Sequence, residues 1–320
     1  MMTRHRGHWT PADRAEAIYR YLPFDVPRDA EGLTVTLRYD HDVGVLDMGL
    51  FDPHRFRGWS GSERDRVTVA ADAATPGYLP GELPAGTWSL LLSLHRVPVD
   101  GLPFDVTVEM GPATHETPPS PLPRPERPPG RDIPASAGRR WLAGDLHAHS
   151  VHSDGSLTID ELASMSRSRG LDFLAVTDHN TTSHHSELAA PSDRLGIILV
   201  PGQEVTTDEG HANCFGDTGW IDFRRPADEW LEGAEASGGL LSVNHPLAGD
   251  CRWRKPMRRR PPLAEVWHSS WDRGALLPIA WWAGWGEGHA IGGSDFHRFG
   301  DAALPGQPTT WLETEDEDVV

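Results

Sequence analysis

Short runs of alternating apolar and polar residues occupy the first 110 positions of the chain. Between Leu33 and Tyr39 every second residue is large and apolar, and Thr or Arg stands between them. A period of two residues is typical of a strand with one buried face. Similar runs, separated by Gly, Pro and Asp, lie at Val45–Phe51, Val67–Ala71, Thr87–His95 and Phe104–Met110. The pattern predicts a small antiparallel β-sandwich over residues 1–110.

A proline-rich stretch follows this part of the chain. Nine of the 24 residues from Gly111 to Pro134 are proline. Proline has no backbone N–H and favours the extended polyproline II conformation, which acts as a semi-rigid spacer. We therefore expect a linker over residues 111–138 and a second domain over residues 139–320.

After the linker, short apolar runs alternate with helical segments. The sequence Thr158-Ile-Asp-Glu161 is a capping box, which predicts a helix that begins there and ends near Gly170. A second helix is expected from Pro226 to Ser237. Seven strands are expected, at Trp141–Leu146, Asp172–Thr177, Gly196–Pro201, His211–Gly216, Leu240–Asn244, Leu263–Trp267 and a last run that ends at Ser294. Strands that alternate with helices favour a parallel α/β barrel.

Histidines and carboxylates lie at the ends of these strands. In chain order they are His147, His149 and Asp154 after the first strand, His179 after the second, Glu204 after the third, His211 at the start of the fourth, His245 after the fifth, and Asp295 and His297 after the last. The C-terminal ends of barrel strands meet at one face, so these nine side chains are expected to converge. Single surface histidines are common, but clusters that recur in order at strand ends favour a metal site. Imidazole and carboxylate donors without thiolate suit Zn, Mn or Fe.

Seven short motifs carry these residues. They are Asp145-Leu-His-Ala-His149, Ser153-Asp-Gly155, Thr177-Asp-His179, Gly202-Gln-Glu204, Gly210-His211, Asn244-His-Pro246 and Gly293-Ser-Asp-Phe-His297. Together they resemble the motifs of the PHP (polymerase and histidinol phosphatase) superfamily over about residues 141–300. The run from Glu204 to Asn213 is similar to the carbaryl-hydrolase-like CehA/McbA branch. The resemblance implies a distorted (β/α)7 barrel that holds two or three divalent ions.

The resemblance also implies roles for individual residues. The first ion would be held by His147, His149, Glu204 and Asp295, the second by the shared Glu204 with His211 and His245, and the third by Asp154, His179 and His297. Glu204, His211 and His268 are the expected catalytic residues. Asp178 is expected to lie behind the ligands and orient a ligand histidine.

The charge of such a site favours a phosphoester substrate. Three divalent ions would bring six positive charges, and Asp154, Glu204 and Asp295 would supply three negative ones. We predict a phosphoesterase that uses a metal-bridging hydroxide as nucleophile. Two alternatives stay open: hydrolysis of a carbamate or carboxylic ester, which the carbaryl-hydrolase-like branch implies, and a non-catalytic, metal-stabilised binding module. A small-molecule phosphoester or ester is the expected substrate, and a nucleic-acid end is less favoured.

A basic run follows the fifth strand. Six of the nine residues from Arg252 to Arg260 are Arg or Lys. Arginine can bind phosphate through two parallel hydrogen bonds, so Arg252 and Arg254, with Arg298 beside the last ligand, are candidate substrate contacts. A solvated loop is the expected role of most other residues in the run.

Four further histidines lie near the motifs. His268 ends the sixth strand, where it could contact substrate or donate a proton to the leaving group, or simply line the rim. His152, His184 and His185 match no ligand position and are expected at the surface.

Composition limits the class of protein. The formal net charge is −18, from 47 acidic and 29 basic residues. We expect so acidic a chain to be repelled by nucleic-acid backbones and anionic membranes, outside its basic run. Two cysteines cannot make a disulfide framework, and the first 20 residues lack an apolar core of signal-peptide length. A soluble cytoplasmic protein is therefore expected.

Overall fold

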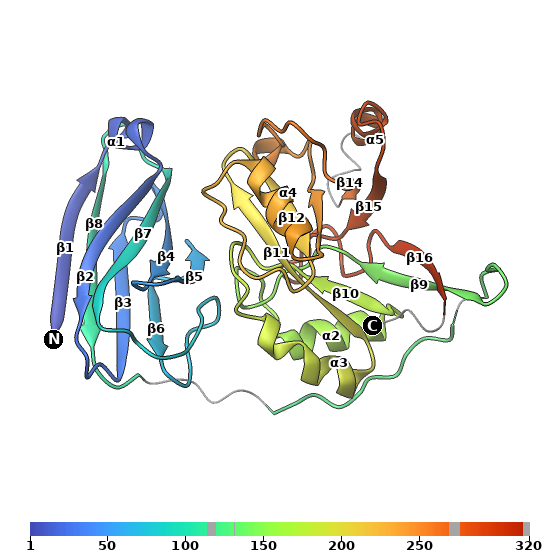
Figure 1. Ribbon diagram of the computed structural model, residues 1–320, viewed down its shortest axis with the longest axis horizontal. Coiled ribbons are helices and arrows are strands. Elements are labelled where there is room, and N and C mark those ends of the chain that lie inside the picture. The colour runs from blue at the N-terminus through green and yellow to red at the C-terminus, as the bar shows by residue number, and fades with distance from the viewer. Residues whose placement is uncertain (114–119, 131, 269–275, 316–320) are drawn as a thin grey trace. The chain divides into compact units, whose positions relative to one another are not determined.

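The chain divides into two units, Met1–Pro119 and Ser120–Val320. The computed structural model describes residues 1–113, 120–130, 132–268 and 276–315. The first unit consists almost entirely of strands, whereas the second combines strands and helices (Figure 1). The expected fold class, a β-sandwich followed by an α/β barrel, is confirmed.

Two four-stranded antiparallel sheets form the described part of the first unit, in the orders β1-β8-β3-β6 and β2-β7-β4-β5. The strands are β1 (Met2–Trp9), β2 (Tyr19–Val26), β3 (Gly32–Tyr39), β4 (Val45–Phe51), β5 (Phe56–Gly61), β6 (Arg66–Ala70), β7 (Gly86–Arg96) and β8 (Leu102–Met110). A short helix, α1 (Pro11–Glu16), begins with a capping box between Thr10 and Asp13. Alternation does not predict β1, β2 or β5, because β1 is mostly exposed and β5 is buried at nearly every position.

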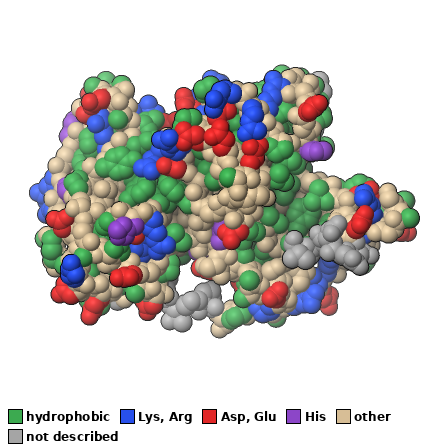
Figure 2. Space-filling view, in the orientation of Figure 1, with side chains coloured by type: hydrophobic (Ala, Val, Ile, Leu, Met, Phe, Trp, Pro, Cys, Tyr) green, Lys and Arg blue, Asp and Glu red, His purple; other side chains and the backbone are tan. Residues whose placement is uncertain are grey.

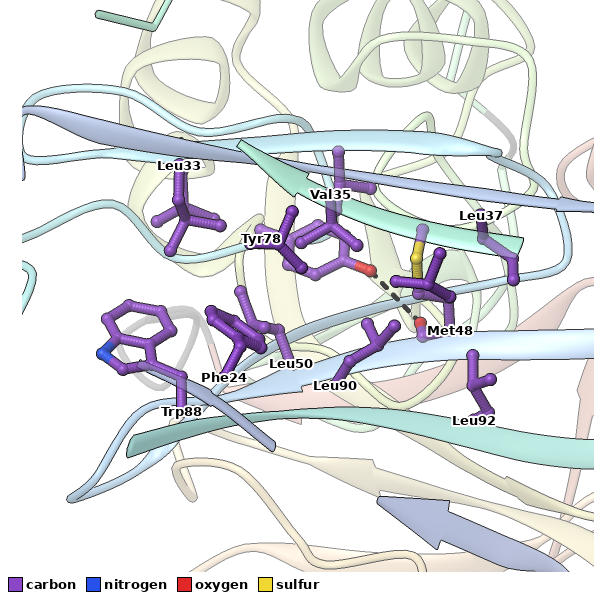
Figure 3. Close-up of a cluster of buried hydrophobic side chains, with 14 of the residues drawn as sticks. Phe24, Leu33, Val35, Leu37, Met48, Leu50, Tyr78, Trp88, Leu90 and Leu92 are labelled. Atoms are coloured by element: carbon purple, nitrogen blue, oxygen red, sulfur yellow. Dashed lines mark hydrogen bonds between the residues drawn. The ribbon is translucent and has the colours of Figure 1, made fainter. Parts of the chain in front are cut away.

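Apolar side chains from both sheets fill the space between them. Leu33 and Val35 of β3 belong to the same buried cluster as Leu90 and Leu92 of β7 (Figure 3). The Tyr78 hydroxyl in this cluster has a partner, because it donates to the Met48 carbonyl at 3.2 Å. This core is what the period of two residues predicts.

Arg57 is a fully buried cation in the same unit. Its guanidinium donates to the backbone carbonyls of Leu79 (2.9 Å), Gly81 (3.2 Å) and Glu82 (3.0 Å), and to the Asp52 carboxylate at 3.2 Å. Burial lowers the pKa of this guanidinium. These hydrogen bonds fasten the irregular segment around residues 79–82 to β5.

A single mixed sheet of eight strands forms the centre of the second unit, as far as the structure describes it. Its order is β15-β14-β13-β12-β11-β10-β9-β16. The strands are β9 (Arg139–Asp145), β10 (Phe173–Val176), β11 (Ile198–Thr207), β12 (Gly210–Phe215), β13 (Leu240–Val243), β14 (Leu263–His268), β15 (His289–Gly293) and β16 (Thr310–Glu315). Only β12 and β16 run antiparallel to the other strands. The sheet is therefore mixed, whereas a purely parallel sheet was expected.

The two edge strands of this sheet are joined by one side chain. The Thr310 hydroxyl of β16 accepts from the Gly292 N–H of β15 at 3.0 Å and donates to the Gly292 carbonyl at 2.8 Å. Nearby, the buried Asp145 carboxylate accepts from the N–H groups of Ser294 (3.0 Å) and Gly306 (2.7 Å). These contacts nearly close the sheet into a barrel.

The helices of the second unit lie between its strands in sequence. They are α2 (Ile159–Ser168), α3 (Ala189–Leu195), α4 (Ala227–Ala236), α5 (Leu276–Ala283) and two short 3₁₀ helices, η1 (His185–Glu187) and η2 (Gly249–Cys251). The predicted capping box is present in α2, where Thr158 and Glu161 exchange hydrogen bonds. In the described parts of the chain no helix is both long enough and apolar enough to cross a bilayer.

The second half of the proline-rich stretch packs on α2 and α3. The Leu122 N–H donates to Asp160 at 2.7 Å, and Arg194 of α3 bonds both the Leu122 carbonyl and the Asp160 carboxylate. Arg127 pairs with Asp172 just before β10. Residues 120–130 are therefore part of the second unit and do not form a free spacer.

Candidate metal centre

The sheet brings its polar residues to one face. His147 and His149 follow β9, His179 follows β10, and His245 follows β13. These strands run parallel, so their C-terminal ends lie together. The last parallel strand, β15, is followed by Asp295 and His297.

Glu204 and His211 reach this face from two antiparallel strands, β11 and β12, whereas parallel strands were expected. Glu204 lies inside β11, which continues to Thr207 and pairs antiparallel with β12. His211 stands at the start of β12, opposite Thr206. A reversed strand begins where its parallel neighbours end, so His211 still reaches the face that carries the other donors.

Glu204 is fully buried and lies at the centre of five histidines. The shortest approach is 2.7 Å, from its Oε2 to Nδ1 of His179. The other four distances from its carboxylate oxygens are 3.2 Å to His147 Nε2, 3.6 Å to His149 Nε2, 3.2 Å to His211 Nδ1 and 3.3 Å to His245 Nε2. One carboxylate therefore faces donors that come from β9, β10, β12 and β13.

Two further carboxylates complete the constellation. Asp295 Oδ1 lies 3.1 Å from Nε2 of both His147 and His149. Asp154 Oδ1 lies 3.4 Å from His297 Nε2 and 3.6 Å from His179 Nε2.

Among the residues that the structure describes, three groups of donors are close enough to hold ions. Each has its donor atoms within 4.8 Å of one another: His147, His149, Glu204 and Asp295; His179, Glu204 and His211; and His149, Asp154, His179 and His297. The first group is the one the resemblance implies. The second contains His179, while His245 stands beside it at 3.3 Å from Glu204.

Several buried side-chain atoms of the centre lack a hydrogen-bond partner in the described structure, and their chemistry fits divalent ions. Buried side-chain atoms without a hydrogen-bond partner in the described structure include His147 Nε2, His149 Nδ1, Asp154 Oδ1, Glu204 Oε2, His211 Nδ1 and His245 Nδ1. Leaving a buried polar atom unsatisfied costs about 1–3 kcal/mol, so such atoms rarely cluster without a ligand. Imidazole nitrogen and carboxylate oxygen are donors suited to Zn, Mn or Fe. The buried donors are consistent with divalent metal ions.

Electrostatics puts several donors in the forms that bind metal. Burial works against ionisation of Glu204 and Asp295, but the surrounding histidines hold the pKa of both carboxyls well below the ordinary range. Burial and two neighbouring histidines lower the pKa of His149 to about 4. Burial opposes the charge of His147, yet three carboxylates raise its pKa well above the ordinary value. Metal binding at His147 therefore requires release of a proton.

Backbone strain concentrates at this centre. Asn180, His245 and Asp295, with φ of 54°, 24° and 53°, are the non-glycine residues with positive φ in the described part of the chain. Two of them are candidate ligands, and Asn180 follows a third, His179. Such conformations cost about 1–3 kcal/mol each and cluster at functional sites.

The sequence does not predict the roles of two buried residues of the centre, Glu265 and Asn244. Glu265 of β14 lies 3.1 Å from His147 Nδ1 and accepts from the His245 N–H at 2.7 Å. Asn244 donates from its side-chain amide to Glu204 Oε1 at 2.8 Å. The signal for Glu265 is an acidic residue inside an otherwise apolar strand, where an unpaired carboxylate would be costly.

The prediction that His152 and His184 lie at the surface is wrong, since both are buried. His184 Nδ1 lies 3.2 Å from Asp178, and His152 Nδ1 bonds the Ser183 hydroxyl at 2.8 Å. Burial of these two imidazoles is compensated by polar partners, the Asp178 carboxylate and the Ser183 hydroxyl. His185 is half-buried and bonds the Gly202 carbonyl at 3.0 Å.

Asp178 supports the loop between two candidate ligands. Its carboxylate accepts from the Ser150 N–H (2.9 Å) and hydroxyl (2.7 Å), and from the Ser153 hydroxyl (2.6 Å). These serines lie between His149 and Asp154. Asp178 thus holds the loop that carries ligands, in addition to its contact with His184 Nδ1.

The candidate catalytic residue His268 lies within the centre, whereas the candidate substrate contacts Arg252, Arg254 and Arg298 are exposed. His268 Nε2 lies 3.0 Å from Asp295 Oδ2, so His268 is within the centre. Arg298 is exposed and donates to the Asp154 carbonyl at 2.8 Å. Arg252 is exposed, and the Arg254 guanidinium donates to the Asp208 carbonyl.

Other residues of the basic run pair with α4. Arg258 lies 3.1 Å from Asp228, and Arg259 lies 2.7 Å from Glu235. Figure 2 shows basic and acidic side chains interspersed on the displayed face rather than gathered into one basic area. This supports the expectation that most of the run is a solvated, paired loop.

Fold and site together define a barrel protein with a buried histidine and carboxylate centre suited to metal ions. No family model matches the chain. It is 40% identical over 62 residues to a phosphoribosyl 1,2-cyclic phosphate 1,2-diphosphodiesterase of Eggerthella lenta, which covers 19% of this chain and 24% of that protein. It is 42% identical over 66 residues to a 3',5'-nucleoside bisphosphate phosphatase of Chromobacterium violaceum, covering 21% and 23%.

A 5'-3' exoribonuclease of Haemophilus influenzae is 38% identical over 64 residues, which is 20% of this chain and 23% of that enzyme. The chain thus spans about a quarter of the length of these curated relatives. One solved structure is that of a two-domain protein from Bacteroides vulgatus that contains a predicted PHP-like metal-dependent phosphoesterase. Its sequence is 23% identical, the match covers 54% of this chain and 57% of that chain, and the TM-score is 0.42. Over part of its length the chain is homologous to a phosphodiesterase, a phosphatase and an exoribonuclease, enzymes that act on phosphoester bonds. The carbaryl-hydrolase-like branch stays a prediction.

Proposed function

We propose that the chain is a metal-dependent phosphoesterase that holds two or three divalent ions. The observation that carries the proposal is the fully buried Glu204 among five histidines, with Asp154 and Asp295 beside them. The partial homology with enzymes that act on phosphoester bonds supports the same reaction. When bound, the ions supply a water acidified toward neutral pH and positive charge for the phosphoryl group.

The chain's own residues divide between holding ions and meeting substrate. The Asp154, His297 and Asp295 side chains are 34%, 21% and 20% exposed, whereas those of His149 and Glu204 are wholly buried. Substrate therefore approaches from the side of Asp154, His297 and Asp295. Arg298 is exposed on this side, anchored to the Asp154 carbonyl, and is our candidate for a phosphate contact.

His268 holds Asp295 in place in this proposal. Its Nε2 lies 3.0 Å from Asp295 Oδ2, and Asp295 Oδ1 faces His147 and His149. Burial opposes the charged form, but the bond to Asp295 and the nearby Glu265 raise the pKa of His268. A protonated His268 at the edge of the centre is also suited to donate a proton to a leaving group.

Metal analysis followed by an ester panel tests the proposal. Protein purified without chelator is expected to contain two or three transition-metal ions per chain by elemental analysis. With that metal supplied, hydrolysis of bis(p-nitrophenyl) phosphate or p-nitrophenyl phosphate should exceed hydrolysis of p-nitrophenyl acetate and a naphthyl carbamate. Less than one ion per chain after growth in metal-supplemented medium would contradict the metal site. Preferential carbamate or acetate hydrolysis would instead favour the carbaryl-hydrolase-like activity.

Replacing Arg258 and Arg259 with Ser is expected to leave KM for a phosphoester near the wild-type value. Both arginines are paired with carboxylates around α4 and are exposed. An Arg298→Ser variant should raise KM for the same substrate and leave a neutral ester less affected. Steady-state kinetics at two salt concentrations provide the measurement. A strong, salt-sensitive rise in KM for the double variant would show that the basic run contacts substrate after all.

A further inference from the structure

A buried glutamate touches two of the ligand histidines without belonging to any donor group. Glu265 is 2% exposed, and its two oxygens have separate partners, His147 Nδ1 at 3.1 Å and the His245 N–H at 2.7 Å. We propose that Glu265 is a positioning residue that aims His147 and His245 and thereby sets the affinity of the first and second ions. This inference rests on the proposed function, because it concerns ions that the proposed enzyme binds.

The contact with His147 selects one form of the imidazole ring. A neutral imidazole carries its proton on one nitrogen and offers the lone pair of the other. An ionised carboxylate can only accept, so Glu265 keeps the N–H of His147 on Nδ1. The remaining nitrogen, Nε2, lies 3.2 Å from Glu204 Oε1 and 3.1 Å from Asp295 Oδ1. The lone pair of His147 is therefore directed among the other donors of the first group.

The second contact of Glu265 supports a strained backbone. His245 has φ of 24°, in a region that non-glycine residues rarely adopt. The bond from its N–H to Glu265 Oε2 is short and charge-assisted, and it helps hold this conformation. The resulting turn places His245 Nε2 3.3 Å from Glu204 Oε1. One carboxylate on β14 thus fixes donors that follow β9 and β13.

A glycine reserves the space for the Glu265–His147 pair. A Cβ atom at Gly293 would lie 2.5 Å from Glu265 Oε1 and 2.3 Å from the His147 Cβ, so alanine there would force the two apart. The preceding Gly292 faces elsewhere, toward Pro308 at 2.9 Å and Trp267. Adjacent glycines of β15 therefore offer a test variant and a matched control.

Metal titration of four full-length proteins tests the inference. The wild type, Glu265→Gln, Gly293→Ala and the control Gly292→Ala would be stripped with chelator and titrated with Mn²⁺, with free Mn²⁺ followed by electron paramagnetic resonance. In Glu265→Gln the amide can accept from one histidine only, because its NH₂ meets the other N–H donor. We expect the Mn²⁺ sites that use His147 or His245 to weaken by about 10- to 100-fold in Glu265→Gln and Gly293→Ala. The site held by Asp154, His179 and His297, and all sites of the Gly292→Ala protein, should keep wild-type affinity.

The absorption of bound Co²⁺ separates positioning from a general effect on the fold. The visible bands of bound Co²⁺ should change in both test variants while the far-ultraviolet circular dichroism stays the same. Wild-type affinities in both variants, or equal losses in Gly292→Ala, would overturn the inference. If Glu265→Gln does not fold, Gly293→Ala alone decides in the same way. A wild type that binds no Mn²⁺ would overturn the proposed function and this inference together, whereas unaffected variants of a metal-binding wild type overturn the inference alone.

Discussion

A Glu204→Gln variant is expected to lose both bound metal and hydrolytic activity. The carboxylate of Glu204 belongs to two of the donor groups and lies within 3.6 Å of five histidines. An amide carries no charge and offers one oxygen instead of two, so one group loses a donor and the other keeps only a neutral one. Substituting a residue that only orients a metal ligand lowers metal affinity or activity by about 10- to 100-fold. The loss of activity in Glu204→Gln should be larger than that. Elemental analysis and phosphoester kinetics on the same preparation measure the two effects.

Glu161→Gln is a matched control for this change. Glu161 closes the capping box of α2, where glutamine serves equally well, and it lies outside the donor groups. It should keep full metal content and activity. If Glu204→Gln did the same, Glu204 would not be the shared ligand.

An Arg57→Leu variant should show the largest loss of stability in the sandwich. Leucine would leave the buried Asp52 carboxylate and the carbonyls of Leu79, Gly81 and Glu82 without their donor. Removing one partner of a buried ion pair costs about 3–5 kcal/mol. Because the chain has two units, calorimetry should resolve a lowered transition for one of them and a nearly unchanged transition for the other.

Arg55→Leu is the appropriate comparison for this variant. Arg55 also faces Asp52, at 3.7 Å, but its side chain is 53% exposed. Exposed ion pairs contribute little, so its transition should stay close to that of the wild type. Equal transitions in the two variants would mean that the buried hydrogen bonds of Arg57 add no net stability.

The sequence predicts the parts of this protein that depend on local order. Alternation identifies β3, β4, β6, β7 and β8, because each has one face in the sandwich core. The capping box identifies the start of α2 for a similarly local reason. Strand direction is not local: β12 and β16 are reversed by pairings with β11 and β9 that no periodicity encodes.

The same distinction applies to the centre. The structure brings the nine candidate ligands together because they lie just after parallel strands, on the β11–β12 hairpin or, for Asp154, in the loop between β9 and α2. Glu265 and His152 could not be placed correctly from sequence, because their burial depends on partners far along the chain. His147, for example, is 118 positions from Glu265.

The near-closure of the barrel has a consequence for how the protein is made. Thr310 of β16 pairs with Gly144 of β9, and its hydroxyl bonds Gly292. Contacts this distant in sequence form slowly, because a long loop must close before they stabilise anything. During synthesis the sandwich can fold as soon as it emerges from the ribosome, since domains generally fold as units from the N-terminus. The donors from His147 to His297 can assemble only after His297 has been synthesised, so binding of the proposed ions would follow folding of the sandwich.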